Sequence, residues 1–316
     1  MNTHDANARP INRREMLAVT GATAVGLSTG IAMAADKPGY IDAHSHIWTP
    51  DVKSFPLKDG QTADDLKPRS FTDDELMAIA SKVGVDRVVL IQHTGYHGFD
   101  NSYLVHAWKK HPKRFRVVGM VDDSKAAPGK KMEKLFKQGV TGFRITPFTR
   151  GDDVWLDNPG MREMWKTAAK TRQAMCCLIN ASNLPQVDKM CDANPDTKVV
   201  IDHFARVGVS GTIDPKELKA LCQIARHKNA SIKVSAYYAL GKKKPPHDDL
   251  IPMIKQVYES YGPKRMMWAS DCPYQIQGEN NYPASIGLIK DRIDFFSDSD
   301  KEWILRKTAE SVFFFA

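Results

Sequence analysis

Short apolar runs, rich in β-branched residues, recur along the chain from Tyr40 onward. Each run ends in polar residues and is followed by a segment with helical features. Runs this short and this apolar do not alternate between polar and apolar positions, which is typical of buried parallel strands. The eight predicted strands are Tyr40–His46, Arg87–Ile91, Arg116–Val121, Thr141–Ile145, Ala174–Ile179, Lys198–Asp202, Ser231–Ser235 and Met266–Ser270.

The segments between these strands carry helix start and stop signals. Serine or threonine three residues before glutamate forms a capping box, and proline suits the first position of a helix. Glycine ends helices because it adopts the left-handed conformation easily. The predicted starts are the capping boxes Thr72–Glu75 and Ser299–Glu302 and the pair Asp214–Pro215, and the predicted stops are Gly84 and Gly139.

Eight strand–helix alternations without a second compositional block predict one domain, a single (β/α)₈ TIM barrel over residues 35–316. An open, doubly wound α/β sheet of similar size is the alternative.

Residues 1–34 have the layout of a twin-arginine signal peptide. Arg13 and Arg14 precede a weakly apolar stretch, and Ala32-Met33-Ala34 forms a cleavage site of the A-x-A kind. This layout predicts export to the periplasm by the Tat machinery. An accidental arginine pair before an uncleaved anchor is the alternative interpretation.

Composition and charge exclude several classes of protein. The 316 residues are 42% hydrophobic and 26% charged, as in an ordinary globular protein, and no apolar run after position 40 is long enough for a membrane span.

The net charge of +8 is spread along helical faces, which argues against a nucleic-acid partner but would attract a small anionic substrate. The five cysteines form no CxxC motif or disulfide framework. Nothing in the sequence specifies an oligomeric state.

The strongest chemical signal is the pair His44 and His46 at the end of the first predicted strand. Alternate residues of a strand face the same way, so both imidazoles project from one side and can share a metal or bracket a substrate. Asp271 closes the eighth strand, which lies beside the first in a closed barrel. Its carboxylate is therefore a candidate metal ligand, general base, or both. A simple turn aspartate before Pro273 is the alternative.

Further polar residues follow other predicted strands. His203 is a third candidate catalytic imidazole, with a core or capping histidine as the alternative. Arg144 suits bidentate capture of a substrate carboxylate, although a structural ion pair would also explain it. The remaining candidate substrate-binding residues are Gln92, His93, Asn180, Tyr237 and Tyr274.

Taken together, these motifs resemble the amidohydrolase-related family of the amidohydrolase superfamily, in particular its lactonase branch, which includes enzymes similar to 2-pyrone-4,6-dicarboxylate lactonase. The resemblance implies a TIM barrel that hydrolyses a C–O bond of a lactone. It implies that Asp271 takes a proton from water, while His44, His46 and His203 polarise the carbonyl or hold a metal and Arg144 holds a carboxylate. The matching stretches are IDAHSHIW (41–48), VVLIQ and GFDNSYL within 88–104, GVTGFRI (139–145), VVIDHFAR (199–206) and MMWASDCPY (266–274).

The sequence departs from the family pattern at two strand ends. Many metal-dependent relatives have a histidine after strand five and some a lysine after strand four, where this chain has Asn180 and Arg144. A binuclear centre is therefore not expected. One divalent ion, zinc or similar, on His44, His46 and Asp271 is one hypothesis, and metal-free catalysis is the other. The alternatives to a lactonase are a metal-dependent non-oxidative decarboxylase of an aromatic or unsaturated acid, an inactive periplasmic binding module, and another hydrolase such as an amidase.

Overall fold

The computed structural model describes residues 39–151 and 155–315. The predicted signal segment, residues 1–34, lies outside the described residues and stays a prediction. In the part of the chain that the structure describes, no helix is both long and apolar enough to cross a membrane.

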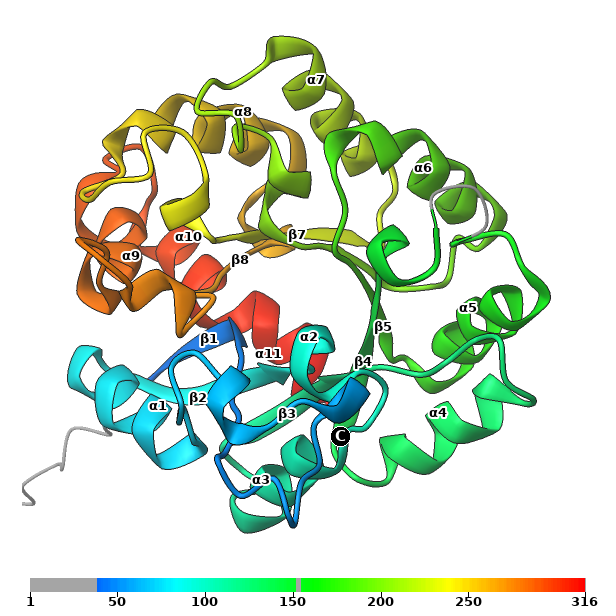
Figure 1. The fold of residues 1–316 in the computed structure, drawn as a ribbon. Coiled ribbons are helices and arrows are strands. Elements are labelled where there is room, and N and C mark those ends of the chain that lie inside the picture. The colour runs from blue at the N-terminus through cyan, green and yellow to red at the C-terminus, as the bar shows by residue number, and fades with distance from the viewer. Residues whose placement is uncertain (1–38, 152–154, 316) are drawn as a thin grey trace, which may run out of the picture. The chain divides into compact units, whose positions relative to one another are not determined.

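Eight parallel strands form one sheet in the order in which they occur along the chain (Figure 1). The sheet closes because Ser45 pairs in parallel with Cys272, just beyond the last strand, and the backbone N–H of Asp271 donates to the carbonyl oxygen of His44 at 2.8 Å. The predicted TIM barrel is therefore confirmed, and the open sheet is excluded. The strands are β1 (Tyr40–Ser45), β2 (Val85–Ile91), β3 (Phe115–Gly119), β4 (Val140–Ile145), β5 (Ala174–Cys177), β6 (Val199–Ile201), β7 (Ala230–Val234) and β8 (Met266–Trp268).

Helices surround the ring of strands (Figure 1). The capping box of Thr72 and Glu75 is present at the start of α1, and Asp214 caps α7 with proline in the first turn. One start was wrong: Ser297, and not Ser299, caps α10, because its hydroxyl pairs with the N–H and carboxylate of the residue three positions on. The helices are α1 (Asp73–Ala80), α2 (Thr94–His97), α3 (Ser102–Lys110), α4 (Pro128–Phe136), α5 (Pro159–Thr171), α6 (Leu184–Ala193), α7 (Pro215–Gln223), α8 (Ile251–Tyr261), α9 (Tyr282–Gly287), α10 (Asp298–Glu302) and α11 (Thr308–Phe313).

The last helix, α11, closes the amino end of the barrel. Its Ala309, Val312 and Phe313 belong to the apolar cluster that fills the barrel interior, together with side chains from several strands. We call these three side chains of α11 the plug. A side chain at Gly142 in β4 would press against the Phe313 ring, so this glycine leaves space for the plug. Because the amino end is filled with hydrocarbon, the carboxyl ends of the strands are the accessible mouth, where TIM-barrel enzymes carry out their chemistry.

Candidate active site

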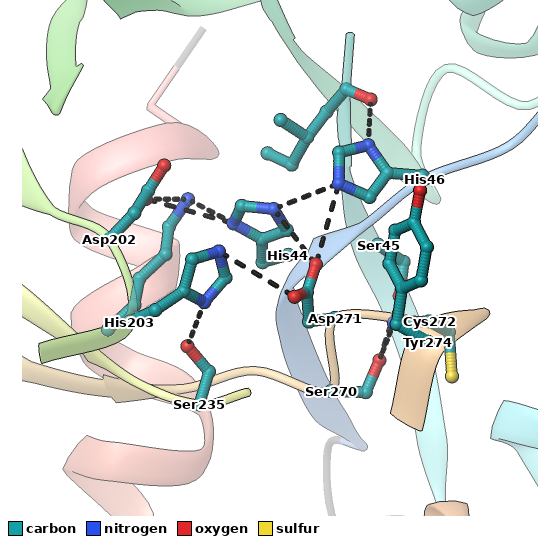
Figure 2. Close-up of polar contacts among 12 residues, drawn as sticks. His44, Ser45, His46, Asp202, His203, Ser235, Ser270, Asp271, Cys272 and Tyr274 are labelled. Atoms are coloured by element: carbon teal, nitrogen blue, oxygen red, sulfur yellow. Dashed lines mark hydrogen bonds and ion pairs between the residues drawn. The ribbon is translucent and has the colours of Figure 1, made fainter. Parts of the chain in front are cut away.

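His44 and His46 both turn into the barrel mouth from the end of β1 (Figure 2). Their Nε2 atoms are 3.4 Å apart. Nδ1 of His46 lies 2.9 Å from the carbonyl oxygen of Ile91, which can only accept. The ring hydrogen of a neutral His46 is therefore on Nδ1, and its Nε2 presents a lone pair to the centre. This is the state in which histidines ligate metals.

Asp271 follows β8 and reaches the same point (Figure 2). Its Oδ1 is 3.4 Å from Nε2 of His44 and 3.4 Å from Nε2 of His46. Its other oxygen, Oδ2, accepts a hydrogen bond from the hydroxyl of Tyr238 at 2.8 Å. Oδ1 has no hydrogen-bond donor among the residues that the structure describes. The predicted convergence of the histidine pair and this carboxylate is therefore present.

These three atoms form a triangle suited to a cation. With the ring hydrogen of His46 on Nδ1, its Nε2 and Oδ1 of Asp271 are both acceptors that face each other across 3.4 Å, and no described residue donates to that oxygen. Zinc with tetrahedral ligands at about 2.1 Å holds neighbouring ligand atoms about 3.4 Å apart. The sides of the triangle agree with that separation. The buried group His44, His46 and Asp271 can thus hold a metal ion.

Protonation states favour the same arrangement. Burial, and after it the positive charge of Lys233, lowers the pKa of His44 well below its ordinary value. Burial alone would raise the pKa of Asp271, but the three histidines around it hold that pKa well below its usual range. The centre therefore combines a neutral imidazole with an ionised carboxylate at neutral pH, and these are the forms that accept protons or bind metals.

His203 enters the site from a strained turn after β6. The residues from His203 to Arg206 have φ values of 51°, 54°, 50° and 60°, a left-handed turn without any glycine. Each such residue costs roughly 1–2 kcal/mol, and strain of this kind is typical of functional sites. Nδ1 of His203 is 2.8 Å from the hydroxyl of Ser235, and Nε2 is 3.8 Å from Oδ2 of Asp271.

A buried ion pair lies behind His44 and was not predicted from the sequence. Lys233 in β7 is fully buried, with its Nζ 3.0 Å from Asp202 and 3.1 Å from Nδ1 of His44. A lysine in the middle of an otherwise apolar buried strand was the signal available in the sequence. Lysine is almost never fully buried unless it is paired, so this position called for a carboxylate partner.

Arg144 reaches the centre from β4. One guanidinium nitrogen, Nη2, is 2.7 Å from Nε2 of His44 and 3.4 Å from Asp202. Both ring nitrogens of His44 thus face cations that only donate, although a neutral imidazole has one acceptor nitrogen. Of the two cations that face His44, Arg144 borders the cavity and Lys233 does not, and Nε of Arg144 has no partner among the described residues.

A cavity of about 500 Å³ opens above the centre. Two arginines and several aromatic side chains line it, and Asp271 is the acidic residue in its lining. Arg206, carried by the left-handed turn, was not predicted as a site residue and brings a second guanidinium to the wall. The lining residues that carry polar groups are His46, His93, Thr94, Arg144, His203, Arg206, Tyr238, Asp271 and Tyr274.

Three of the predicted substrate-binding residues do not line this cavity. The Gln92 amide donates to the carbonyl oxygen of Gly98 and so holds a loop. Asn180 lies at the start of a short helical turn, and its backbone N–H donates to a neighbouring side chain. Tyr237 is buried in the core with its hydroxyl on a backbone carbonyl, because the left-handed residue before it turns the chain. Tyr238 faces the cavity in its place.

A second buried carboxylate, Asp42, fastens the two strands that carry the centre. It accepts the backbone N–H of His44 at 3.1 Å and the N–H and hydroxyl of Ser270 at 2.9 and 2.6 Å. The hydroxyl groups of Ser45 and Tyr282 also donate to it, each at 2.7 Å. Asp42 therefore ties the end of β1 to Ser270, the residue directly before Asp271, a role that was not predicted from the sequence.

Two other groups of acids and histidines lie at the protein surface. Asp188 and Asp192 are paired with Arg226, and Lys110 contacts Asp73 and Asp74. Their carboxylates already have cationic partners, in contrast to Oδ1 of Asp271. The buried centre is therefore the better candidate for a metal or a catalytic water.

The fold and site together define a class, a TIM-barrel enzyme with a histidine–carboxylate centre at the carboxyl end of its strands. The model of the amidohydrolase family matches residues 41–315, and the chain belongs to this family. It is a hydrolase of that family, and its relatives include lactonases.

Comparison with known proteins gives distant relatives with related activities. The 4-sulfomuconolactone hydrolase of Rhizobium radiobacter is 26% identical over 252 residues, covering 78% of this chain and 79% of that protein. The L-fucono-1,5-lactonase of Burkholderia ambifaria is 27% identical over 241 residues, covering 74% and 80%. The structure of a probable 2-pyrone-4,6-dicarboxylic acid hydrolase from Acinetobacter baumannii, with citric acid bound, superposes with a TM-score of 0.74 at 21% identity, covering 88% of this chain and 100% of that one.

Proposed function

We propose that the protein hydrolyses a small lactone, or a related cyclic ester, that carries a carboxylate or a similar anionic group. The observation that carries this proposal is Oδ1 of Asp271, a buried carboxylate oxygen that has no donor among the described residues. It lies 3.4 Å from the imidazoles of His44 and His46, and Asp271 and His46 line the cavity. The curated relatives that act on a sulfomuconolactone and a fuconolactone support the choice of a cyclic ester.

Asp271 acts as the general base in this proposal. A water molecule bound at Oδ1 gives a proton to that oxygen while its own oxygen bonds to the carbonyl carbon of the lactone. The tetrahedral carbon then expels the ring oxygen, which breaks the C–O bond and takes the proton from the Asp271 carboxyl group. The product is an open-chain hydroxy acid, and Asp271 returns to its ionised form. The hydroxyl of Tyr238 holds the other carboxylate oxygen throughout, which orients Oδ1.

Arg144 and Arg206 bind the anionic part of the substrate. Both line the cavity, and Arg144 has an Nε without a partner in the part of the chain that the structure describes. A guanidinium makes two parallel hydrogen bonds to a carboxylate or sulfonate, so it fixes the orientation of the ring as well as its charge. Arg144 lies 2.7 Å from His44, and an anion bound to its guanidinium would therefore lie next to the reacting carbonyl.

As the alternative to this metal-free route, in which Oδ1 of Asp271 takes the proton, His44, His46 and the same oxygen would hold one divalent cation, with zinc as the ion that this donor set suits best. Such an ion would supply Lewis acidity at this site. Elemental analysis of the purified protein tests the assignment directly. We expect about one equivalent of a divalent metal in the wild-type chain and a loss of that metal in His46→Ala. A metal content that is unchanged in His46→Ala would contradict the assigned ligands.

A screen for acid release tests the reaction. Lactones are offered in matched pairs, with and without a carboxylate, and proton release is followed at constant pH. We expect hydrolysis of carboxylated lactones and weaker turnover of their neutral counterparts. Release of carbon dioxide from an aromatic or unsaturated acid, without opening of any lactone, would replace the proposal with the decarboxylase alternative.

A further inference from the structure

An aromatic wall stands beside the catalytic centre. The rings of Tyr96 and His93 stack with centroids 4.1 Å apart, and the ring of Tyr274 continues the stack at 6.2 Å from His93. Nε2 of His93 is 2.6 Å from the hydroxyl oxygen of Tyr274. His93 and Tyr274 both line the cavity, and the Tyr274 ring lies 6.0 Å from the ring of His46.

The direction of the hydrogen bonds along this wall follows from the groups involved. The backbone N–H of Tyr96 can only donate, and it points at Nδ1 of His93 at a distance of 3.1 Å. An accepting Nδ1 means that the imidazole is neutral and that its one ring hydrogen is on Nε2. His93 therefore donates to Tyr274, whose oxygen is the acceptor in the 2.6 Å contact.

Tyr274 is left with a hydroxyl hydrogen that needs an acceptor. Among the hydrogen bonds within residues 39–151 and 155–315, none uses this hydrogen. Tyr238 is the informative comparison, because it also lines the cavity but donates its hydrogen to Oδ2 of Asp271. Of these two tyrosines, Tyr274 is the one that can donate to a molecule in the cavity.

We propose that Tyr274 is a catalytic residue that donates a hydrogen bond to the carbonyl oxygen of the lactone. The inference rests on the proposed function, since it assigns a role in the same ring-opening step. The carbonyl oxygen gains negative charge when water adds to the carbon, and a fixed donor stabilises that charge without reorganising. His93 is a positioning residue in this arrangement, because its donated hydrogen bond fixes the direction of the Tyr274 hydroxyl.

Removal of the hydroxyl in Tyr274→Phe tests the role. We expect kcat on the best lactone of the screen to fall about 10²-fold, with KM within about threefold of wild type, because the bond strengthens in the transition state. Tyr96→Phe is the matched control. This variant also loses a tyrosine hydroxyl from the aromatic stack, but that hydroxyl accepts a hydrogen bond from the backbone N–H of Lys67. The variant should therefore leave kcat within about twofold of wild type.

A kcat of Tyr274→Phe within about threefold of wild type, or a loss that appears in KM alone, would overturn the proposal. A second measurement needs no substrate and so separates this inference from the proposed function. NMR of protein labelled with ¹⁵N-histidine should place the ring hydrogen of His93 on Nε2 and show its signal shifted in Tyr274→Phe. A hydrogen on Nδ1 of His93 would refute the donor chain even if the enzyme opens lactones.

Discussion

The two ends of the barrel interior differ in almost every physical respect. At the amino end, Phe313 and Val312 of α11 fill the space between the strands with hydrocarbon. At the carboxyl end, buried charges and imidazoles from β1, β4, β6, β7 and β8 meet within hydrogen-bond reach of one another. One end is thus built for burial, and the other holds groups that are costly to bury.

This difference assigns separate tasks to the two ends. Apolar burial contributes about 25 cal/mol per Å² to stability and requires little directional precision. The carboxyl end contributes chemistry instead, and its left-handed turn at residues 203–206 costs stability. Substitutions at the mouth should therefore change rate with little effect on unfolding, whereas substitutions at the plug should do the reverse.

The largest effect is expected at His46, in the centre of the mouth. His46→Ala should lower kcat by about 10⁴-fold, equivalent to about 5.5 kcal/mol of transition-state stabilisation. Its ring nitrogens contact the carbonyl oxygen of Ile91 at 2.9 Å and Nε2 of His44 at 3.4 Å, and the loss of these two contacts should leave the thermal unfolding midpoint within a few degrees of wild type. Kinetics paired with calorimetry provides the check. A strongly lowered midpoint with normal kcat would show that His46 stabilises the fold and does not take part in catalysis.

Phe313→Ala makes the opposite change at the plug. The ring is fully buried, so its removal should lower the free energy of unfolding by about 4 kcal/mol. Denaturant titration measures this loss. Nζ of Lys233 lies over this ring, 5.5 Å from its centroid, so kcat of the folded fraction should fall slightly, far less than in His46→Ala. Phe314→Ala, which removes the half-buried neighbouring ring over Arg87 and Arg116, is the control and should cost less. An inactive but stable Phe313→Ala protein would show that the plug takes part in catalysis.

A smaller effect is expected at Arg144. Arg144→Lys keeps the charge but loses the planar pair of donors, so KM for carboxylated lactones should rise about tenfold, or about 1.4 kcal/mol. Neutral lactones of the same ring size provide the comparison, and their KM should change little. An equal rise for both kinds of substrate would show that Arg144 has a structural role and does not recognise the anion.

The smallest effect is expected at Ser235, which contacts His203 at 2.8 Å from within the mouth. Ser235→Ala removes one partner of a ring that the surrounding turn already positions, so kcat should fall about threefold, or about 0.7 kcal/mol. Steady-state kinetics at a temperature well below the unfolding transition measures the change. A loss as large as that of His46→Ala would mean that this hydroxyl controls the centre.

Much of the fold and part of the site could be predicted because they depend on local rules. The period of two along a strand and the closure of strand eight on strand one were enough to bring His44, His46 and Asp271 together. Those rules end where regular strands end. The left-handed conformation at Ala236 breaks the alternation, so Tyr238 lines the cavity where Tyr237 was predicted to do so.

Other site residues depend on contacts that the sequence does not specify. Lys233 pairs with Asp202 across two neighbouring strands, and only the barrel register shows that they meet. Arg206 reaches the cavity from a left-handed turn without glycine, a conformation that no local preference indicates. Asp42 stands within the quoted IDAHSHIW motif, but its partners Ser270 and Tyr282 lie more than two hundred residues away.

The rate of lactone opening by Asp271→Asn tests the central claim most directly, because the amide has the size of the carboxylate but cannot accept the proton from water. Single-turnover rates with a carboxylated lactone, measured beside the unfolding midpoint, should show a loss of at least about 10³-fold in a protein as stable as wild type to within a few degrees. A folded Asp271→Asn protein that opens the lactone within about tenfold of the wild-type rate would contradict the claim that this carboxylate and the imidazole pair form the hydrolytic centre.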